Sequence, residues 1–526
     1  MVRRTDAALA AGFGLAAVAT RWLHRGHALF SWDSGMLASG VVDYDFAAGH
    51  PHPPYYPLAI AVAKVLALWS SPVDGLVLAA VLSSGVLVAF TYLAARGLVG
   101  VPASSLAAAL VLLSPTALFN GIAPLTYALE GASSAVVAWA AWRCRKAPGL
   151  REAVVLGVVT SIAIGVRPSS LFLVAPLALW GAWGSWRSVL QGAAAGGATT
   201  LAWLVPALVA GGGARWFLLG TSYQSRNFVF AHTVLQDGWG VVPRYAGRLA
   251  SSVPWELPVV LAVVVAAAVT ALVWWRHRPA SPAGSFLVVW LTPSLAFYVL
   301  VYDGWPVYPS GYVMPLAPAV AVLLAVLLDR MVVGFLRSGA PRSATSAALF
   351  LVGLLVAAPA GWATSWDDAV SGQREADAWA ALLPSLRDEF PANETVIVTY
   401  YGWFWVKFGL PEYLLWGAHP YAGPDGRFYA GIVEHQDGRE HPPGYARALE
   451  ALGDDPLHPL PPWAKQVVMV YGPPTRGEVQ AFKDDVPVEK LVLRSGLRVD
   501  VVAAEHVATI EQALRWFDDS GRPLPG

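Results

Sequence analysis

The segment SWDSGMLASGVVDYDFAAGHPHPPYYP, residues 31–57, is the stretch on which the interpretation of this sequence depends. It holds three aspartates, two histidines, three tyrosines and four prolines between a first apolar segment and a long apolar tract. Within that tract, residues 58–142, the charged residues are Lys64, Asp74, Arg96 and Glu130. Ionisable groups gathered beside membrane segments commonly mark functional sites. We therefore expect this loop to carry chemistry at a membrane face.

The composition is that of a membrane protein. The 526 residues are 56% hydrophobic and 13% charged, and the mean hydropathy is +0.51, whereas soluble domains carry about 25% charged residues. Repeated apolar stretches of roughly 17–22 residues are long enough to cross a bilayer as helices. We predict a polytopic α-helical membrane protein. The net charge of zero gives no indication of nucleic-acid binding.

The N-terminal segment 7–23 follows the sequence MVRRTD and could be mistaken for a signal peptide. Because Arg21, His24 and Arg25 follow it where a cleavage site would need small residues, we predict an uncleaved first span. Cys144 is the only cysteine, so an intrachain disulfide is excluded.

Charge distribution predicts the orientation of the spans. The candidate spans are 7–23, 54–70, 75–95, 103–119, 122–142, 153–165, 169–184, 190–211, 257–274, 285–302, 313–333 and 346–362. Basic clusters, which favour the cytoplasmic side, then put the N-terminus inside and the region after residue 362 outside. This arrangement needs an odd number of crossings. We expect 54–70, which opens with prolines and carries Lys64, to be re-entrant or interfacial, which leaves about 11 crossings.

Composition changes after residue 362, where charges, prolines and short apolar runs replace long spans. We predict an amphipathic helix at 375–386, strands at 395–400 and 466–471, a helix at 475–484 and a hairpin across 490–503. The segment 420–463 is rich in Pro, Gly and His and is predicted to be loop. Strands alternating with helices indicate a small α/β domain outside the membrane.

Asp33 is the main candidate in the first outer loop. A carboxylate near a membrane face can accept a proton from a hydroxyl nucleophile or bind a cation, although Asp is also a common helix N-cap. Asp43 and Asp45 would share one face of an extended segment, where they could hold a divalent cation, or one of them is simply solvated.

His50 and His52 lie among prolines that keep the chain stiff and extended. They could form hydrogen bonds with a sugar or a phosphate, or the segment could be no more than a rigid turn that opens a helix. Their spacing, with no obvious third ligand, is weak support for zinc. Tyr55 and Tyr56 have the alternative role of interfacial aromatic residues.

Four further residues are expected on the same outer side. Glu130 lies in an apolar span and must face a cavity, pair or be protonated, because a buried charge is costly in a membrane. Arg167 suits bidentate phosphate recognition, or it anchors lipid headgroups, and Arg226 is a weaker second phosphate candidate. Asp303, in a turn that also contains Tyr312, could close over a substrate, or the turn could merely present aromatic anchors.

These motifs together resemble the GT-C superfamily of membrane glycosyltransferases, and most nearly its protein O-mannosyltransferase-like branch. That branch has a loop similar to WDSGE followed by HPPGYPL, and the chain matches it at residues 32–35 and 52–58. Met36 stands where the family often has an acidic residue, and Tyr55 stands where it has glycine. The segments 114–130, 165–169 and 311–318 look like later landmarks of the family.

The resemblance covers the membrane part and implies a transmembrane glycosyltransferase-like domain, 1–362, with a catalytic first outer loop at 24–57. The tail, 363–526, is predicted from its composition to be the second domain, an extracytoplasmic α/β domain. It implies an integral protein of the cell membrane that transfers a monosaccharide from a polyprenyl-phosphate donor to a protein, glycan or lipid acceptor outside. Carried over by position, Asp33 would be the catalytic base. The departing phosphate would be stabilised by Arg167, with Arg226 or a divalent cation as possible help.

Two other classes of function remain open on the sequence. A transporter or lipid flippase would place ionisable residues near the membrane midplane and often shows inverted repeats, whereas here the acids gather at one face and no repeat is evident. A non-catalytic scaffold would not need three aspartates and two histidines beside stiff prolines.

Overall fold

The computed structural model describes residues 4–47, 49–225, 233–251, 282–301, 311–338, most of 370–399, 403–422, 428–435, 460–470, 482–507 and Ala513. Contacts divide the chain into two compact units. The first unit comprises Met1–Gly26, Pro53–Ala210 and Thr221–Ser371, and the second comprises His27–His52, Gly211–Gly220 and Gly372–Gly526. Residues 27–52, most of the predicted first outer loop, therefore group with the C-terminal region and not with the helices that flank them in sequence.

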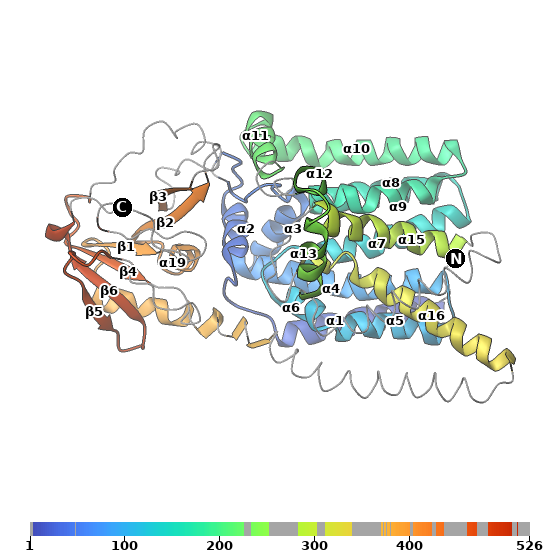
Figure 1. Cartoon of the computed structure of the whole chain (residues 1–526), viewed down its shortest axis with the longest axis horizontal. Helices are drawn as coiled ribbons and strands as arrows, with labels where there is room; N and C mark the ends of the chain where they lie inside the picture. The colour runs from blue at the N-terminus through green and yellow to red at the C-terminus, as the bar shows by residue number, and fades with distance from the viewer. Residues whose placement is uncertain are drawn as a thin grey trace. The chain divides into compact units, whose positions relative to one another are not determined.

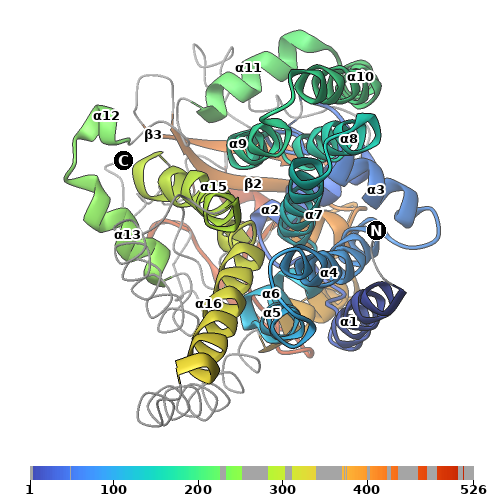
Figure 2. The same ribbon diagram turned by 90° about the vertical axis from the view of Figure 1, so that its right-hand side faces the viewer.

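The first unit is a bundle of apolar helices (Figures 1 and 2). Its longer helices are α1 (Arg4–Leu23), α4 (Pro72–Arg96), α5 (Val101–Leu113), α7 (Tyr127–Lys146), α8 (Leu150–Val166), α9 (Leu171–Ala182), α10 (Trp186–Ala210), α15 (Pro282–Ala296) and α16 (Ala317–Ser338). Figure 2 looks along the bundle and shows α7 among α4, α8 and α9, with which it packs.

The shorter elements of this unit lie at the helix ends. They are α3 (Pro57–Ala67), α6 (Pro115–Ile122), the 3₁₀ turn Pro168–Ser170, α12 (Val234–Asp237), α13 (Val241–Ser251), the π-helical turn Phe297–Val301 and the 3₁₀ turn Gly311–Val313. Among the described residues three helices are long and apolar enough to cross a membrane, or four if the bent pair α5–α6 forms one span. The prediction of 11 crossings is therefore not confirmed, and the candidate spans 257–274 and 346–362 lie outside the described residues.

The predicted single span 103–119 is broken. The chain bends by 56° between α5 and α6. Ser114 caps α6 by accepting a hydrogen bond from the Ala117 amide, and Pro115 occupies the first turn. Proline lacks an amide hydrogen and suits the start of a helix far better than its interior, so a new helix starts here.

The segment 54–70 contains the short apolar helix α3, and the helices before and after it bear on whether the segment crosses a membrane. Asp6 near the start of α1 forms an ion pair with Arg96 at the end of α4, with 2.8 Å between Oδ1 and Nε, and it accepts a hydrogen bond from Tyr92. The two antiparallel helices pack closely at Gly14 and Gly85, so the end of α1 and the start of α4 lie on one side of the bundle. The intervening α3 has 11 residues, about 16 Å, which is half the thickness of a bilayer core. This geometry supports the expectation that the segment is re-entrant or interfacial.

The second unit contains a six-stranded mixed sheet in the order β3-β2-β1-β4-β6-β5 (Figure 1). Its strands are β1 (Thr395–Thr399), β2 (Leu414–Ala422), β3 (Phe428–His435), β4 (Gln466–Val470), β5 (Glu489–Val492) and β6 (Arg498–Ala503). Strands β2, β1 and β4 are parallel, with Val396 opposite Leu414 and Val467, and the outer pairs are antiparallel. Buried aliphatic residues of these strands form the core with Trp416 and Phe482.

The remaining helices of this unit are α2 (Trp32–Val42), the start of α11 (Ala214–Gln224), α18 (Leu386–Glu389) and α19 (Trp403–Gly409). The predicted strands at 395–400 and 466–471 match β1 and β4, and the predicted hairpin matches β5–β6, with Gly496 at φ +89° in its turn. The described residues of 376–386 are helical, as expected. The predicted helix 475–484 and the boundary near residue 362 fall mainly outside the described residues.

One prediction for this region is wrong in part. Residues 420–422 and 428–435, expected to be loop, belong to β2 and β3. β2 pairs with β1 as far as Gly417, and its pairing with β3 continues through Pro420 to Ala422. Such pairing is a non-local effect that local composition does not reveal.

Candidate functional site

The first candidate cluster is built on the N-terminus of α2. Ser31 and Ser34 form a capping box, because each side chain accepts a hydrogen bond from the backbone amide of the other. Asp33 lies in the first turn, where the positive end of the helix dipole favours a negative charge. Its side chain is 38% exposed, so the carboxylate is accessible. The N-cap, the alternative role for Asp33, is filled by Ser31.

The chain returns to Asp33 through the proline-rich segment. His52 Nε2 lies 3.9 Å from Asp33 Oδ1, and the imidazole is only 10% exposed. The return passes against α2 at Gly40, where a Cβ atom would lie 2.5 Å from Pro51 Cδ. Glycine is therefore required at position 40 for the two segments to meet.

The DYD pair has structural roles in the loop. Asp43 is the C-cap of α2, and its amide donates to the Ser39 carbonyl. Asp45 and His50 exchange two backbone hydrogen bonds, and Asp45 Oδ1 accepts a hydrogen bond from the Ala47 amide. Together these contacts close a tight turn. Within the described part of the chain, no group of three or more His, Cys, Asp or Glu side chains is arranged to hold a metal ion.

The second cluster lies inside the helical unit, where a buried ion pair joins α7 to the end of α8. Arg167 Nη1 donates to Glu130 Oε2 over 3.2 Å, and the two side chains are 10% and 3% exposed. Ser170 donates to Glu130 Oε1 over 2.9 Å, and Arg167 Nε donates to Ser169 Oγ over 3.3 Å. Of the three alternatives expected for Glu130, the structure shows pairing, and the partner is Arg167.

Aromatic rings surround this pair. The guanidinium carbon of Arg167 lies 4.8 Å from the ring centroid of Tyr127, 5.2 Å from that of Tyr312 and 5.7 Å from that of Tyr56. Such contacts stabilise a cation electrostatically. Tyr127 and Tyr312 also pack edge to face. Gly311 permits this approach, because a Cβ atom there would lie 2.0 Å from the Tyr127 ring.

Of the remaining predicted site residues, Tyr55 is described by the structure, whereas Arg226 and Asp303 are not. Tyr55 is 1% exposed and has a φ of +69°, and Tyr56 has a φ of +45°. Such values are costly for residues with a side chain, and they fall where the resembled motif has glycine followed by tyrosine. Arg226 and Asp303 lie outside the described residues.

Two contributors were not identified from the sequence. Ser170 and Tyr127 complete the environment of Glu130 and Arg167. The spacing of Tyr127 gave a usable signal, since it precedes Glu130 by three residues and therefore shares its helix face. The contact of Ser170 with Glu130 spans 40 positions, and no local pattern indicates it.

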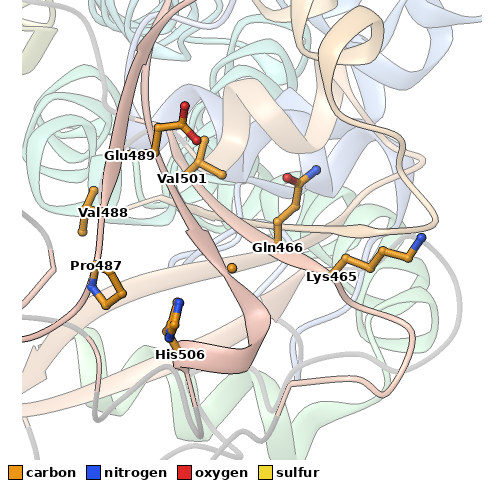
Figure 3. Close-up of a pocket in the computed structure, with 8 residues that line it drawn as sticks. Lys465, Gln466, Pro487, Val488, Glu489, Val501 and His506 are labelled. Carbon is orange, nitrogen blue, oxygen red and sulfur yellow. The ribbon is translucent and has the colours of Figure 1, made fainter.

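A cavity of about 590 Å³ lies at one end of the C-terminal sheet (Figure 3). Its walls include Lys465, Gln466, Glu489, Val501 and His506. Lys465 forms an ion pair with Glu394, and His506 Nε2 lies 3.6 Å from Glu505 Oε1. None of the residues predicted to form the site lines this cavity.

Comparisons with known proteins identify the fold. No family model and no curated protein matches the chain. Among solved structures it resembles ArnT from Cupriavidus metallidurans bound to undecaprenyl phosphate, with a TM-score of 0.57 and 15% identity over 94% of this chain and 97% of that one. The apo state of the same protein gives a TM-score of 0.54 with 16% identity over the same shares.

The oligosaccharyltransferase of Archaeoglobus fulgidus tethered with an acceptor peptide gives a TM-score of 0.51, with 13% identity over 89% of this chain and 69% of that one. All of these are membrane glycosyltransferases of one superfamily. The likeness extends over nearly the whole length of the chain, and the apolar helices agree with an integral membrane location. The chain therefore has the fold of the GT-C superfamily of membrane glycosyltransferases.

Proposed function

We propose that this protein is a membrane glycosyltransferase that moves a monosaccharide from a polyprenyl-phosphate donor to an acceptor hydroxyl on the extracytoplasmic face. The observation that carries the proposal is the accessible carboxylate of Asp33 beside the buried His52, on a chain with the GT-C fold. One solved structure with this fold contains undecaprenyl phosphate, and this supports a lipid-phosphate donor here. The charge distribution supports an outward-facing loop.

In the proposed reaction Asp33 accepts the proton of the acceptor hydroxyl. The oxygen forms a bond to the anomeric carbon while the bond from that carbon to the phosphate oxygen breaks, so the polyprenyl phosphate leaves with the electron pair. Attack opposite the leaving group inverts the anomeric configuration. His52 orients the carboxylate of Asp33. General base catalysis of this kind contributes about 10²- to 10⁴-fold to a rate.

Arg167 is the proposed partner of the donor phosphate. Glu130 and Ser169 hold Nη1 and Nε, and Nη2 makes no hydrogen bond within the described part of the chain. Its N–H groups thus suit a phosphate oxygen. Roles for Asp43, Asp45, His50, Tyr55, Arg226 and Asp303 in substrate binding, and the O-mannosyltransferase-like specificity, remain predictions.

The test uses purified full-length protein in lipid nanodiscs with a panel of undecaprenyl-phosphate monosaccharides and mixed acceptors. We expect release of undecaprenyl phosphate together with glycosylated product by the wild type. Sugar nucleotides added without a lipid carrier should give no product. Transfer from a sugar nucleotide alone, or no turnover of any lipid-linked sugar, contradicts the proposal.

A further inference from the structure

Side chains of the C-terminal region form hydrogen bonds with the loop backbone a few residues before Asp33. Asp377 Oδ1 accepts hydrogen bonds from the amides of His27 and Ala28, at 2.9 and 2.7 Å. Gln373 Nε2 donates to the Ala28 carbonyl over 3.0 Å and to Asp377 over 3.2 Å. Three backbone groups of two adjacent residues are therefore held by two side chains that are four positions apart.

A second C-terminal element continues the contact. Trp405 of α19 donates its Nε1–H to the Leu29 carbonyl over 2.6 Å, and the indole is 7% exposed. Strand β2, which is part of the sheet, packs on α19, and α19 packs on α2. The hydrogen bonds to residues 27–29 are therefore connected, through α19, to the sheet of the second unit.

The next two residues are also hydrogen-bonded, and their partner lies in the helical turn that contains Asp33. The amides of Phe30 and Ser31 both donate to Ser34 Oγ, at 2.9 and 2.8 Å, and this serine belongs to the capping box of α2. Every residue from His27 to Ser31 thus has a hydrogen-bonded backbone group. Asp33 is in the first turn of α2, directly after these residues, so its direction depends on this anchored segment.

The far end of the loop is fixed in a similar way. The Phe46 amide donates to the Gly211 carbonyl over 3.1 Å, and the ring of Phe46 packs 5.5 Å from that of Phe217. A Cβ atom at Gly211 would lie 2.5 Å from the Phe46 ring. The loop is consequently anchored before Asp33 and again at Phe46, between Asp33 and His52, by segments distant in sequence.

We propose that Asp377, Gln373 and Trp405 are positioning residues that fix the loop carrying Asp33, so that the C-terminal region is a structural part of the catalytic centre and not only an appended domain. The inference rests on the proposed function for its catalytic consequence. It predicts that removing these hydrogen bonds lowers kcat, because a small misplacement of a reacting group can lower the rate about 100-fold. Donor binding should change little.

The experiment compares full-length wild type with Asp377→Ala, Asp377→Asn and Trp405→Phe. The asparagine keeps an acceptor oxygen for the two amides, and Asp485→Ala, an exposed aspartate of the same unit, is the matched control. Two quantities are measured: hydrogen exchange of the amides in 27–36, and kcat and KM for an undecaprenyl-phosphate sugar on which the wild type is active.

We expect Asp377→Ala and Trp405→Phe to speed exchange in 27–36 and to lower kcat about 10- to 100-fold, with KM within about threefold of the wild type. Asp377→Asn should recover most of kcat, and Asp485→Ala should match the wild type in both measurements. Unchanged exchange in 27–36 overturns the inference, and so does faster exchange with unchanged kcat. If the wild type transfers no sugar, the proposed function fails, and the exchange data alone then decide whether the C-terminal region fixes this loop.

Discussion

Asp33 and His52 face each other across the first outer loop, with 3.9 Å between Oδ1 and Nε2. The capping box of α2 fixes the first residue, and the passage of Pro51 over Gly40 brings in the second. Nineteen positions separate them in the chain, so the pairing arises from the fold of the loop.

The first prediction concerns His52. We expect His52→Ala to lower kcat about 10- to 100-fold, because the carboxylate of Asp33 loses the group that orients it while the proposed base itself remains. Initial rates with a saturating lipid-linked sugar measure the effect. His506→Ala, which removes an exposed histidine of the same unit, should leave kcat unchanged. A kcat of His52→Ala equal to that of the wild type would remove His52 from the mechanism.

The second prediction concerns the buried ion pair. Breaking a buried pair leaves an uncompensated charge and costs about 3–5 kcal/mol, so Glu130→Ala should be strongly destabilising. Glu152→Ala is the matched control, since Glu152 and Arg143 also lie 3.2 Å apart but are 21% and 34% exposed. Its cost should stay below about 1 kcal/mol. Denaturant titration of the micelle-bound protein measures both, and equal costs would refute the interpretation.

The third prediction concerns the backbone at Tyr55. At a φ of +69°, alanine should carry a penalty of about 1–2 kcal/mol that glycine avoids, so Tyr55→Gly should be more stable than Tyr55→Ala. Tyr44 is a buried tyrosine of the same loop without a positive φ. There the order should reverse, because glycine normally loses more conformational entropy than alanine. The same order at both positions would argue against strain at Tyr55.

The fourth prediction concerns pH and the C-terminal region. A hydrogen bond from Arg387 lowers the pKa of Glu412. A lowered pKa in the folded state means that the pair stabilises the protein above the pKa of the unfolded glutamate and loses this effect as pH falls through the folded value. Both groups are more than a third exposed, so the contribution at pH 7 is below about 1 kcal/mol.

Arg387→Ala should therefore lower stability more at pH 7 than at pH 3. Thermal unfolding of the two proteins at both pH values checks this difference. A larger loss of stability by Arg387→Ala at pH 3 than at pH 7 would contradict a stabilising pair of Arg387 with ionised Glu412.

Much of the fold follows from local sequence. Runs of apolar residues predict the helices well, as for 75–95 against α4 (Pro72–Arg96), because hydropathy over a bilayer length is itself the physical requirement. The break at Ser114 and Pro115 was visible as a capping serine before a proline, but the surrounding apolar run concealed it. Strand β2 was not predicted, and its residues from Pro420 onward were predicted to be loop, since the pairing with β3 that forms the strand there outweighs the local effect of Pro420.

The candidate site was predictable to a similar extent. Asp33, His52, Glu130 and Arg167 were chosen from residue type and position, and the structure brings them together as two pairs. The contacts that arrange them were not predictable. Asp377 lies 350 positions from His27, and Ser170 lies 40 from Glu130, so these hydrogen bonds depend on tertiary packing and not on any local pattern.

The most direct measurement of the central claim is single-turnover transfer by Asp33→Asn in nanodiscs with an undecaprenyl-phosphate sugar on which the wild type is active. Asparagine keeps the shape of the side chain and removes the proton acceptor, so we expect the rate to fall about 10³-fold, with donor binding and thermal stability near the wild-type values. Asp485→Asn should retain the wild-type rate. A rate for Asp33→Asn within about threefold of the wild type would contradict the assignment of Asp33 as the catalytic base.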